Sequence, residues 1–429
     1  MRRSLQDWLA HLEALHPLGA AGIELGLGRV KRVQAQLGQR QTVPLITVAG
    51  TNGKGSTCAL LEAILQASGY RVGLYTSPHL LRYNERIRIG ARAIGAVPLC
   101  AAFARVEAAR QQAGRTPLTY FEFGTLAAWE CFSAAAVDVI ILEVGLGGRL
   151  DAVNCYDADC AVITSIDLDH CDYLGDTREA IAIEKAGITR RRRPLVCADP
   201  QPPASLRQRA RTVGALARWW GRDFGYEHDR GRRRWQYWNA SGTRLDLPLP
   251  ALPGEHQLFN AAAALCVLEM LRERLRVTRR SIVAGLGRVR LAGRLDWRAG
   301  KTPLLLDVAH NPQAARVLAG ELAGRPCAGE TWAVLGMLRD KDIAAVIAAM
   351  RGVVTRWLPC SLPGPRGAAA DELLAALAEQ GLRGGVQGFA SPAEALRAAQ
   401  DKANEGDRIV AFGSFLTVAD VLRQLQRKA

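Results

Sequence analysis

The residues best suited to chemistry are Gly50-Thr51-Asn52-Gly53-Lys54-Gly55-Ser56, which follow the apolar run 44–49 and precede a helix-like stretch, Thr57–Ser68. Glycines let backbone N–H groups turn toward phosphate oxygens, the next helix presents its positive end, and Lys54 adds a mobile cation. This arrangement predicts a site for a nucleoside triphosphate. The glycines are closer together than in the common Walker pattern, and Gly55 replaces a hydroxyl residue after the lysine. A glycine turn with an exposed lysine is therefore the structural alternative.

Three polar residues follow other apolar runs, where parallel α/β sheets bind ligands. Glu143 closes the run 139–142 and is a magnesium candidate, because hard oxygen ligands suit that ion. His170 follows 162–166, but a loop histidine bonded to a nearby carboxylate is the favoured interpretation, since histidine rarely binds magnesium. Ser77 follows a shorter run, and its hydroxyl either faces a ligand or caps a turn.

Other polar residues are weaker candidates when taken alone. Lys185 follows Glu184 in a helix-like segment, where an exposed ion pair is the ordinary expectation. Asp307 follows the run 304–306 and either binds a nucleotide or caps the helix after Pro312. Ser414 lies in a small polar turn after 409–412, and this turn could bind a carboxylate through backbone and hydroxyl donors.

The elements that must position these residues alternate between apolar runs and helical periodicity. Runs at 137–144, 161–166 and 195–198, separated by helix-like segments, predict a mainly parallel sheet covered by helices. Residues 222–253 are predicted to form hairpin-like excursions from the main sheet, and a helix is expected over 257–271. A second alternating set begins near Leu304, Ala333 and Ile409. The chain is thus predicted to be an α/β protein with a smaller second α/β domain, divided as 1–292 and 293–429.

Length and charge limit the function classes. The chain has 429 residues, 49% hydrophobic content and a net charge of +15, which favours an anionic partner without selecting one. Arginines concentrate at 190–193, 230–234 and 272–280, mostly as expected for solvated faces and loops. Because regularly interleaved aromatic residues are missing there, nucleic-acid binding is retained only as a weak alternative.

Cysteine usage indicates a reducing compartment. Ten cysteines occur without a Cys-x-x-Cys pair in a chain far longer than a disulfide-stapled domain. Cys155, Cys160 and Cys171 with His170 match no familiar zinc spacing. The first helix-like segment is amphipathic, with Leu5, Trp8, Leu9, Leu12 and Leu15 at helical spacing, and no apolar run is long enough to span a bilayer. We expect a soluble, cytoplasmic enzyme.

Seven ordered motifs together resemble the folylpolyglutamate synthase/dihydrofolate synthase family of Mur ligases over nearly the whole chain. The motifs are Gly-Thr-Asn-Gly-Lys-Gly-Ser at 50–56, Thr-Ser-Pro-His-Leu at 76–80, Thr-Tyr-Phe-Glu at 119–122, Glu-Val-Gly-Leu-Gly-Gly-Arg-Leu-Asp-Ala at 143–152, Leu-Asp-His at 168–170, Glu-Lys-Ala-Gly-Ile at 184–188 and Asp-Val-Ala-His-Asn-Pro at 307–312. The resemblance implies a phosphate-loop Mur-ligase-like central domain and a Rossmann-like C-terminal domain.

The resemblance also implies an ATP-dependent ligase that joins L-glutamate to dihydropteroate and extends reduced folates through an acyl phosphate. Its expected cofactors are ATP and two Mg²⁺ ions, and the expected partners are these small molecules, with no nucleic acid or membrane, for a monomer. The metal ligands it implies are Ser77, Glu143 and His170. It makes Lys54, Lys185 and His310 the catalytic residues, with Lys185 carbamylated to provide a carboxylate near the second ion.

The same resemblance assigns the binding residues. ATP would be held by Gly53, Lys54, Gly55, Ser56, Asn260, Arg294 and Asp307. The pterin-bearing substrate would contact Gly22, Ile23, Glu24, Leu25, Thr119, Tyr120, Phe121, Glu122, Leu150, Asp151 and Ala152. Glutamate would be held by His310 and Ser414.

Three positions depart from the family pattern, and one rival ligase is retained. Ala292 stands where proline is frequent, Cys171 where threonine is frequent, and Glu24 where aspartate is familiar. Glu24 keeps the charge but reaches farther, so its pterin contact is the least secure inference. A Mur-type cell-wall amino acid ligase is the alternative enzyme, against which residues 119–122 argue.

Overall fold

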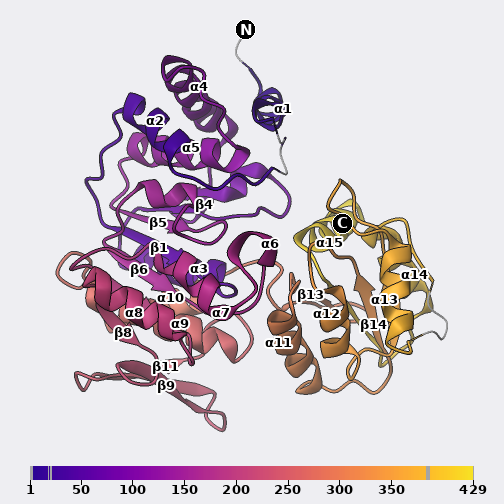
Figure 1. The fold of residues 1–429 in the computed structure, drawn as a ribbon. Helices are drawn as coiled ribbons and strands as arrows, with labels where there is room; N and C mark the ends of the chain where they lie inside the picture. Colours follow the sequence, from indigo (N-terminus) through magenta and orange to yellow (C-terminus); the bar gives the residue numbers. More distant parts are fainter. Residues whose placement is uncertain (1–2, 18, 20–21, 383–386, 429) are drawn as a thin grey trace. The chain divides into compact units, whose positions relative to one another are not determined.

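The chain forms two compact units in the computed structural model, which describes residues 3–17, 19, 22–382 and 387–428 (Figure 1). The first unit comprises Met1–Ala251 and Gln257–Val289, and the second comprises Leu252–His256 and Arg290–Ala429. These units are defined by contacts within the chain. The division into 1–292 and 293–429, which was made from the pattern of apolar runs and glycines in the sequence, stays a prediction.

An eight-stranded sheet in the order β4-β3-β2-β5-β1-β6-β7-β8 forms the centre of the first unit. The strands β2, β5, β1, β6, β7 and β8 are parallel neighbours, whereas β3 and β4 run antiparallel. The mainly parallel sheet predicted from the apolar runs is confirmed. Its strands are β1 Leu45–Ala49, β2 Val72–Tyr75, β3 Ile87–Ile89, β4 Arg92–Ala93, β5 Val139–Glu143, β6 Cys160–Ile163, β7 Pro194–Cys197 and β8 Leu216–Trp219.

Helices cover this sheet because their apolar faces need burial. Trp8 and Leu12 of the first helix are buried, which confirms the amphipathic helix expected there. Gly285 lets α10 approach α3, since a Cβ at Gly285 would lie 2.5 Å from the Ile64 Cα. The helices are α1 Leu5–Leu15, α2 Gly28–Leu37, α3 Lys54–Ala67, α4 Ala96–Gln112, α5 Tyr120–Ala134, α6 Cys171–Leu174, α7 Arg178–Ala186, α8 Ala204–Val213, α9 His256–Met270 and α10 Arg279–Arg288, with 3₁₀ turns η1 Tyr83–Arg86 and η2 Ala152–Cys155.

The segment expected to make hairpin-like excursions forms a three-stranded antiparallel sheet in the order β11-β10-β9. Tyr237 of β10 joins it to α9, because its hydroxyl donates to the Glu269 Oε2 at 3.0 Å. The strands are β9 Phe224–Asp229, β10 Arg234–Asn239 and β11 Arg244–Pro248. The hairpin prediction is confirmed, as is the helix that follows it.

The second unit is a smaller α/β fold around a five-stranded sheet in the order β12-β13-β16-β14-β15. Only β12 pairs antiparallel among its described strands. The predicted starts near Leu304, Ala333 and Ile409 fall in β13, β14 and β16. The elements are β12 Asp296–Arg298, β13 Leu304–Leu306, α11 Pro312–Ala323, β14 Thr331–Leu335, α12 Ile343–Met350, β15 Arg356–Pro359, α13 Ala370–Glu379, α14 Pro392–Lys402, β16 Arg408–Phe412 and α15 Phe415–Lys428.

Two further features of the chain are the length of its apolar helices and the state of its cysteines. Across the residues that the structure describes, none of the helices is both long and apolar enough to cross a bilayer. All ten cysteines are free thiols.

Candidate active site

The glycine loop connects β1 to α3 in a conformation that only glycine adopts without strain. Gly50 and Gly53 have φ of 155° and 85°. A Cβ at Gly50 would lie 1.8 Å from the Thr164 Oγ1, and one at Gly53 would lie 2.5 Å from the Asn260 Oδ1. At these two positions the loop packs against its neighbours with no room for a side chain, unlike an ordinary exposed turn.

Lys54 is the first residue of α3, and its side chain folds back over the loop. The Nζ donates to the Gly50 oxygen at 2.9 Å and to the Thr51 oxygen at 3.1 Å. Gly53 caps the helix without a side-chain hydrogen bond, and the first turn contains no acidic residue. The amides and positive end of α3 are thus suited to an anion beside an ammonium group.

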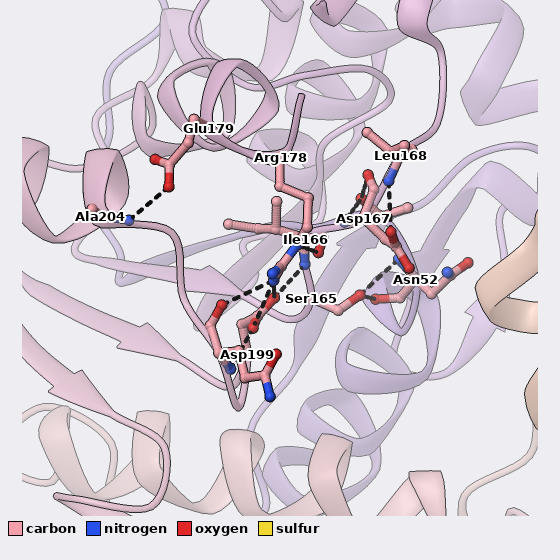
Figure 2. A network of polar contacts seen from close by, with 11 residues as sticks. Asn52, Ser165, Ile166, Asp167, Leu168, Arg178, Glu179, Asp199 and Ala204 are labelled. Atoms are coloured by element: carbon pink, nitrogen blue, oxygen red, sulfur yellow. Dashed lines mark hydrogen bonds and ion pairs between the residues drawn. The ribbon is translucent and has the colours of Figure 1, made fainter. Parts of the chain in front are cut away.

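The loop after β6 holds the other side of the glycine loop (Figure 2). The Thr51 N–H donates to the Ser165 oxygen at 2.7 Å, and the Asn52 N–H donates to the Ser165 Oγ at 3.1 Å. The Asp167 N–H donates to the Thr51 Oγ1 at 3.0 Å. These bonds fix the backbone amides of the glycine loop before any ligand binds.

Asn260, a predicted nucleotide ligand, lies beside the same loop. Its Oδ1 accepts from the Thr57 Oγ1 at 3.4 Å, and its Nδ2 donates to the Gln257 Oε1 at 2.9 Å. Gln257 is fully buried and sets the orientation of the amide. Asn260 therefore connects α9 to the first turn of α3.

The three predicted metal ligands follow strands whose ends are close in the sheet order. Ser77 follows β2, Glu143 ends β5, and His170 lies in the loop after β6. The Ser77 N–H donates to the Glu143 Oε2 at 3.1 Å, and the Glu143 side chain is buried. The loop that carries His170 is the one that holds Thr51.

The chemistry of this donor set fits a divalent cation with retained water. Among described residues, no three His, Cys, Asp or Glu side chains gather closely enough to hold a metal ion. Ser77, Glu143 and His170 supply one hydroxyl, one carboxylate and one imidazole, so substrate oxygens and water would complete the coordination.

Lys185 is buried in α7, with 4% of its surface exposed. Burial, followed by the charge of Lys54, lowers the pKa of its amine to about 7, against the opposing effects of Asp169 and Asp151. Its neighbour Glu184 pairs with Arg149 at 2.8 Å instead. The expectation of an exposed Glu184–Lys185 ion pair is wrong, because the helix turns Lys185 toward the protein interior.

Two segments predicted to bind the pterin are linked by Arg29. Its Nη2 donates to the Glu24 oxygen at 2.7 Å and lies 3.1 Å from the Glu122 Oε1. Glu122 also closes a capping box with Thr119 at the start of α5, where the Thr119 N–H donates to its Oε2 at 2.8 Å. One guanidinium thus holds both segments together, and Glu24 further bonds His16 at 2.9 Å.

The third pterin segment adjoins the first. The Gly26 N–H donates to the Leu150 oxygen at 3.1 Å. Asp151 is buried, and its oxygens accept from the Leu146 N–H at 2.9 Å and the Val153 N–H at 3.0 Å. Burial raises the pKa of the Asp151 carboxyl to about 7, although these backbone bonds oppose the shift. Asp151 therefore shapes the glycine-rich turn after β5 and leads into Ala152.

The remaining pterin candidates are aromatic or lie on the same segments. Phe121 packs 5.6 Å from the Tyr75 ring, and a Cβ at Gly145 would lie 2.8 Å from the Phe121 Cζ. Tyr120 packs edge-on against Tyr83 at 5.6 Å. The partly buried residues Gly22, Ile23 and Leu25 precede α2.

In the second unit, the candidates gather around Phe415. The Arg294 guanidinium lies 5.1 Å from the Phe415 ring, and the His310 ring lies 6.4 Å from it. Asp307 accepts from the Leu295 and Ala309 N–H groups at 2.8 Å each, and burial raises its pKa against the charge of Arg294. Ser414 is buried at the turn into α15.

The alternative role of Asp307 as a helix cap is wrong. Asn311 caps α11, because its side chain accepts from the Ala314 N–H at 2.9 Å. Sequence reasoning missed this cap, although an asparagine directly before proline is a recognised start signal. It also missed Thr51, Ser165, Arg29 and Phe415 as organisers of the site. Thr51 lies inside the motif at 50–56 and Phe415 directly follows Ser414, so these two alone had a sequence signal.

A phosphate loop at the carboxyl edge of a parallel sheet, followed by a second parallel α/β unit, defines a nucleotide-binding enzyme of the α/β class. A family model for the Mur ligase middle domain matches residues 48–268, and one for the Mur ligase glutamate ligase domain matches residues 293–415. The chain is 44% identical to a dihydrofolate synthase/folylpolyglutamate synthase of Escherichia coli, covering 99% of this chain and 96% of that one.

Solved structures agree with this relationship. FolC of E. coli in complex with DHPP and ADP superposes with a TM-score of 0.92 at 43% identity, covering 99% of this chain and 98% of that one. A bifunctional folylpolyglutamate synthase/dihydrofolate synthase with Mn, AMPPNP and L-glutamate bound superposes with a TM-score of 0.90 at 43% identity and the same coverage. The chain therefore belongs to the dihydrofolate synthase/folylpolyglutamate synthase family of Mur ligases.

Proposed function

We propose that this protein is an ATP-dependent ligase that adds L-glutamate to dihydropteroate and to reduced folates. The observation that carries the proposal is the near-complete match to FolC solved with DHPP and ADP. The organised glycine loop with Lys54 agrees with it, because a ligase of this kind must bind and cleave a nucleoside triphosphate.

The chemical problem is that a carboxylate is a poor electrophile. In the proposed reaction, the substrate carboxylate attacks the γ-phosphate of ATP and ADP leaves. The amine of glutamate then attacks the acyl carbon of the resulting acyl phosphate, the C–O bond to phosphate breaks, and the amide forms with loss of a proton and release of inorganic phosphate. Lys54 lies where it would offset charge on the transferring phosphoryl group. The amides of Gly53, Gly55 and Ser56 would hold the phosphates, while Asn260 would orient the nucleotide beside them.

Ser77, Glu143 and His170 would hold Mg²⁺. The ion would neutralise phosphate charge and polarise the reacting oxygens. In the second unit, Arg294 and Asp307 would contact the nucleotide, whereas His310 and Ser414 would hold glutamate. The support is their common arrangement around Phe415 at the ends of β13 and β16.

Lys185 is proposed to be carbamylated. A neutral amine attacks CO₂ and releases a proton, which leaves a carbamate anion able to approach a second Mg²⁺. Burial supports this step, because a pKa lowered to about 7 makes the neutral amine abundant near neutral pH. Mass analysis of peptides prepared with ¹³C-bicarbonate after chemical trapping tests it, and an unlabelled Lys185 would contradict the proposal.

The substrate would be bound by the three linked segments of the first unit. Arg29 joins Glu24 to Glu122, and Gly26 joins Leu150. Tyr120 and Phe121 provide aromatic faces for a flat pterin ring, and Asp151 and Ala152 complete the turn after β5. We further propose a monomer located in the cytoplasm, with no nucleic acid or membrane as partner, and the ten free thiols support the reducing location.

The function is tested by incubating the purified protein with ATP, Mg²⁺, glutamate and either dihydropteroate or tetrahydrofolate. Mass analysis of products is expected to show one added glutamyl group on each substrate, with ADP and phosphate formed. Absence of both products under these conditions would overturn the function. ATP hydrolysis stimulated by RNA or by a muramyl nucleotide would instead support the rival nucleic-acid or cell-wall functions.

A further inference from the structure

Asp199 and Arg178 form an ion pair that the proposed reaction does not use directly, in which the carboxylate is buried and the arginine side chain is 38% exposed. Asp199 follows β7 and is 2% exposed, while Arg178 is the first residue of α7. The Arg178 Nη2 lies 3.3 Å from each carboxylate oxygen of Asp199. Figure 2 shows this pair on one side of the loop after β6 and Asn52 on the other.

The pair holds both backbone groups of one residue, Ile166. The Ile166 N–H donates to the Asp199 Oδ2 at 2.7 Å, and the Arg178 Nε donates to the Ile166 oxygen at 2.9 Å. Gln201 completes the arrangement, because its N–H donates to the Asp199 Oδ1 at 2.8 Å and its oxygen accepts from the Arg178 Nη2 at 2.9 Å. Neither backbone group of Ile166 can shift without losing a charge-assisted hydrogen bond.

The residues on both sides of Ile166 hold the glycine loop. Ser165 accepts from the N–H groups of Thr51 and Asn52, and Asp167 exchanges hydrogen bonds with the Thr51 hydroxyl. A displacement of Ile166 would therefore move the amides of the glycine loop. The same loop continues to His170, so it also leads to a proposed metal ligand.

Arg178 adds a second connection, since α7 also contains Lys185. The next residue, Glu179, accepts from the Ala204 and Ser205 N–H groups at 3.1 and 2.8 Å. These bonds fix the start of α7 against α8, as the Glu179–Ala204 contact in Figure 2 shows. One ion pair thus sets the start of the Lys185 helix and the loop behind the phosphate-binding amides.

We propose that Asp199 and Arg178 are positioning residues for the triphosphate of ATP, acting through Ile166 on the glycine loop. This inference rests on the proposed function and names a part of that site that touches no substrate. Precise placement of reacting groups contributes strongly to catalysis, so a small displacement of the loop is expected to weaken ATP use. The described hydrogen bonds of the pair run to Ile166, Gln201 and each other, and none of them reaches the segments predicted to bind dihydropteroate.

A matched control lies at the opposite edge of the same sheet. Asp159 precedes β6 and is also buried, and it accepts from the Leu45 N–H at 3.0 Å and from the Gln41 Nε2 at 2.9 Å. It contacts Arg193 and, at 2.7 Å, Arg274. Asp159→Asn thus removes the same kind of buried, arginine-paired carboxylate without touching the glycine loop.

The experiment compares Asp199→Asn, Arg178→Gln, Arg178→Lys and Asp159→Asn with the wild type. An asparagine offers one acceptor oxygen, so it cannot serve both Ile166 and Gln201. We expect Asp199→Asn and Arg178→Gln to raise KM for ATP by about tenfold, with smaller changes in KM for dihydropteroate and glutamate. Arg178→Lys should recover only part of the loss, because an ammonium cannot reproduce the planar fork that bonds Ile166, Asp199 and Gln201 together. Asp159→Asn should lower Tm while leaving KM for ATP unchanged.

Calorimetric titration with ADP provides a readout that does not require ligase activity. Weaker ADP binding by both Asp199→Asn and Arg178→Gln, with wild-type binding by Asp159→Asn, would support positioning even if the proposed substrates were wrong. Equal losses in all variants, or wild-type ADP binding and KM for ATP in Arg178→Gln, would overturn it. If Asp199→Asn fails to fold, the two Arg178 variants decide the result. An inactive wild type that binds ADP would count against the proposed function alone.

Discussion

The two edges of the eight-stranded sheet contain similar side chains arranged for different purposes. At the amino edge, Asp159 binds Arg193 and Arg274 and secures the first amide of β1. At the carboxyl edge, Asp199 binds Arg178 and secures Ile166. A buried aspartate paired with arginine therefore does not by itself indicate function. The carboxyl edge differs in the backbone that its ion pair supports. This backbone leads to a glycine loop with no space for a side chain at Gly50 or Gly53, and the loop is followed by a helix without a side-chain cap.

The largest predicted effect is the loss of the loop cation. Lys54→Ala should lower kcat/KM for ligation by about a thousandfold, because no other group would replace its charge beside the phosphates. Steady-state product formation measures the effect. Lys31→Ala changes an exposed lysine of α2 and should retain wild-type rates. Near-normal ligation by Lys54→Ala would remove the loop from the mechanism.

Removal of the carboxylate proposed to bind the metal should have the next largest effect on ligase activity. Glu143→Gln keeps the shape of the side chain but removes the charge that would bind Mg²⁺, so activity should fall by about a hundredfold. The Mg²⁺ concentration for half-maximal activity should rise at the same time. A titration of rate against Mg²⁺ checks both. An unchanged midpoint would assign Glu143 to holding the Ser77 backbone only.

A pair of glycines separates backbone strain from loop packing. Gly53 and Gly69 both have positive φ, 85° and 92°, but only Gly53 has a neighbour within 4 Å of an added Cβ. Both alanine variants should lose about 1 kcal/mol of unfolding free energy from strain. Only Gly53→Ala should also raise KM for ATP, because its Cβ would displace Asn260. Denaturant melts and ATP kinetics measure the two effects, and equal KM values would contradict the packing argument.

Lys185→Met should stabilise the protein in a pH-dependent manner. Burial lowers the pKa of Lys185 from 10.5 to about 7, so below pH 7 the wild type must bury a charged amine. The unfolded chain binds more protons between pH 7 and 10.5, and wild-type stability should therefore rise with pH there. The Tm advantage of Lys185→Met, measured in bicarbonate-free buffer, should be largest below pH 7 and shrink as pH rises. A pH-independent difference would contradict the buried charge.

The smallest effect is expected away from both edges. Arg272 and Glu273 form an exposed ion pair, with 74% and 88% of their side chains exposed. Arg272→Gln should change the unfolding free energy by less than about 0.5 kcal/mol, since solvent screens such pairs. Denaturant melts check this value. A loss of unfolding free energy comparable to that of Asp159→Asn would show that burial does not decide how much an ion pair contributes to stability.

Periodicity and strand ends predicted much of the fold from the sequence. The apolar runs gave β1, β5, β6 and β7, because parallel strands buried on both faces read as continuous hydrophobic segments. The short segment 222–253 was also recognised, since turn residues separate its strands. Ser77, Glu143 and His170 were found by their places after strands, and their metal-binding roles stay predictions.

Tertiary contacts explain what the sequence did not provide. The burial of Lys185 depends on how α7 packs, so local sequence could not separate it from an exposed partner of Glu184. Asp199 follows β7 as Glu143 ends β5, and the same strand-end rule would have flagged it. Arg29 had no such signal, because its partners Glu24 and Glu122 become neighbours only when α2 packs near α5.

The most direct test of the account follows oxygen atoms through the reaction. Dihydropteroate labelled with ¹⁸O in its carboxylate is incubated with ATP, Mg²⁺ and glutamate, and the released phosphate is analysed by mass. The account predicts one ¹⁸O atom in the phosphate for each amide formed, because the carboxylate oxygen leaves with the phosphoryl group. Amide formation with unlabelled phosphate would contradict the acyl phosphate and the mechanism built on Lys54.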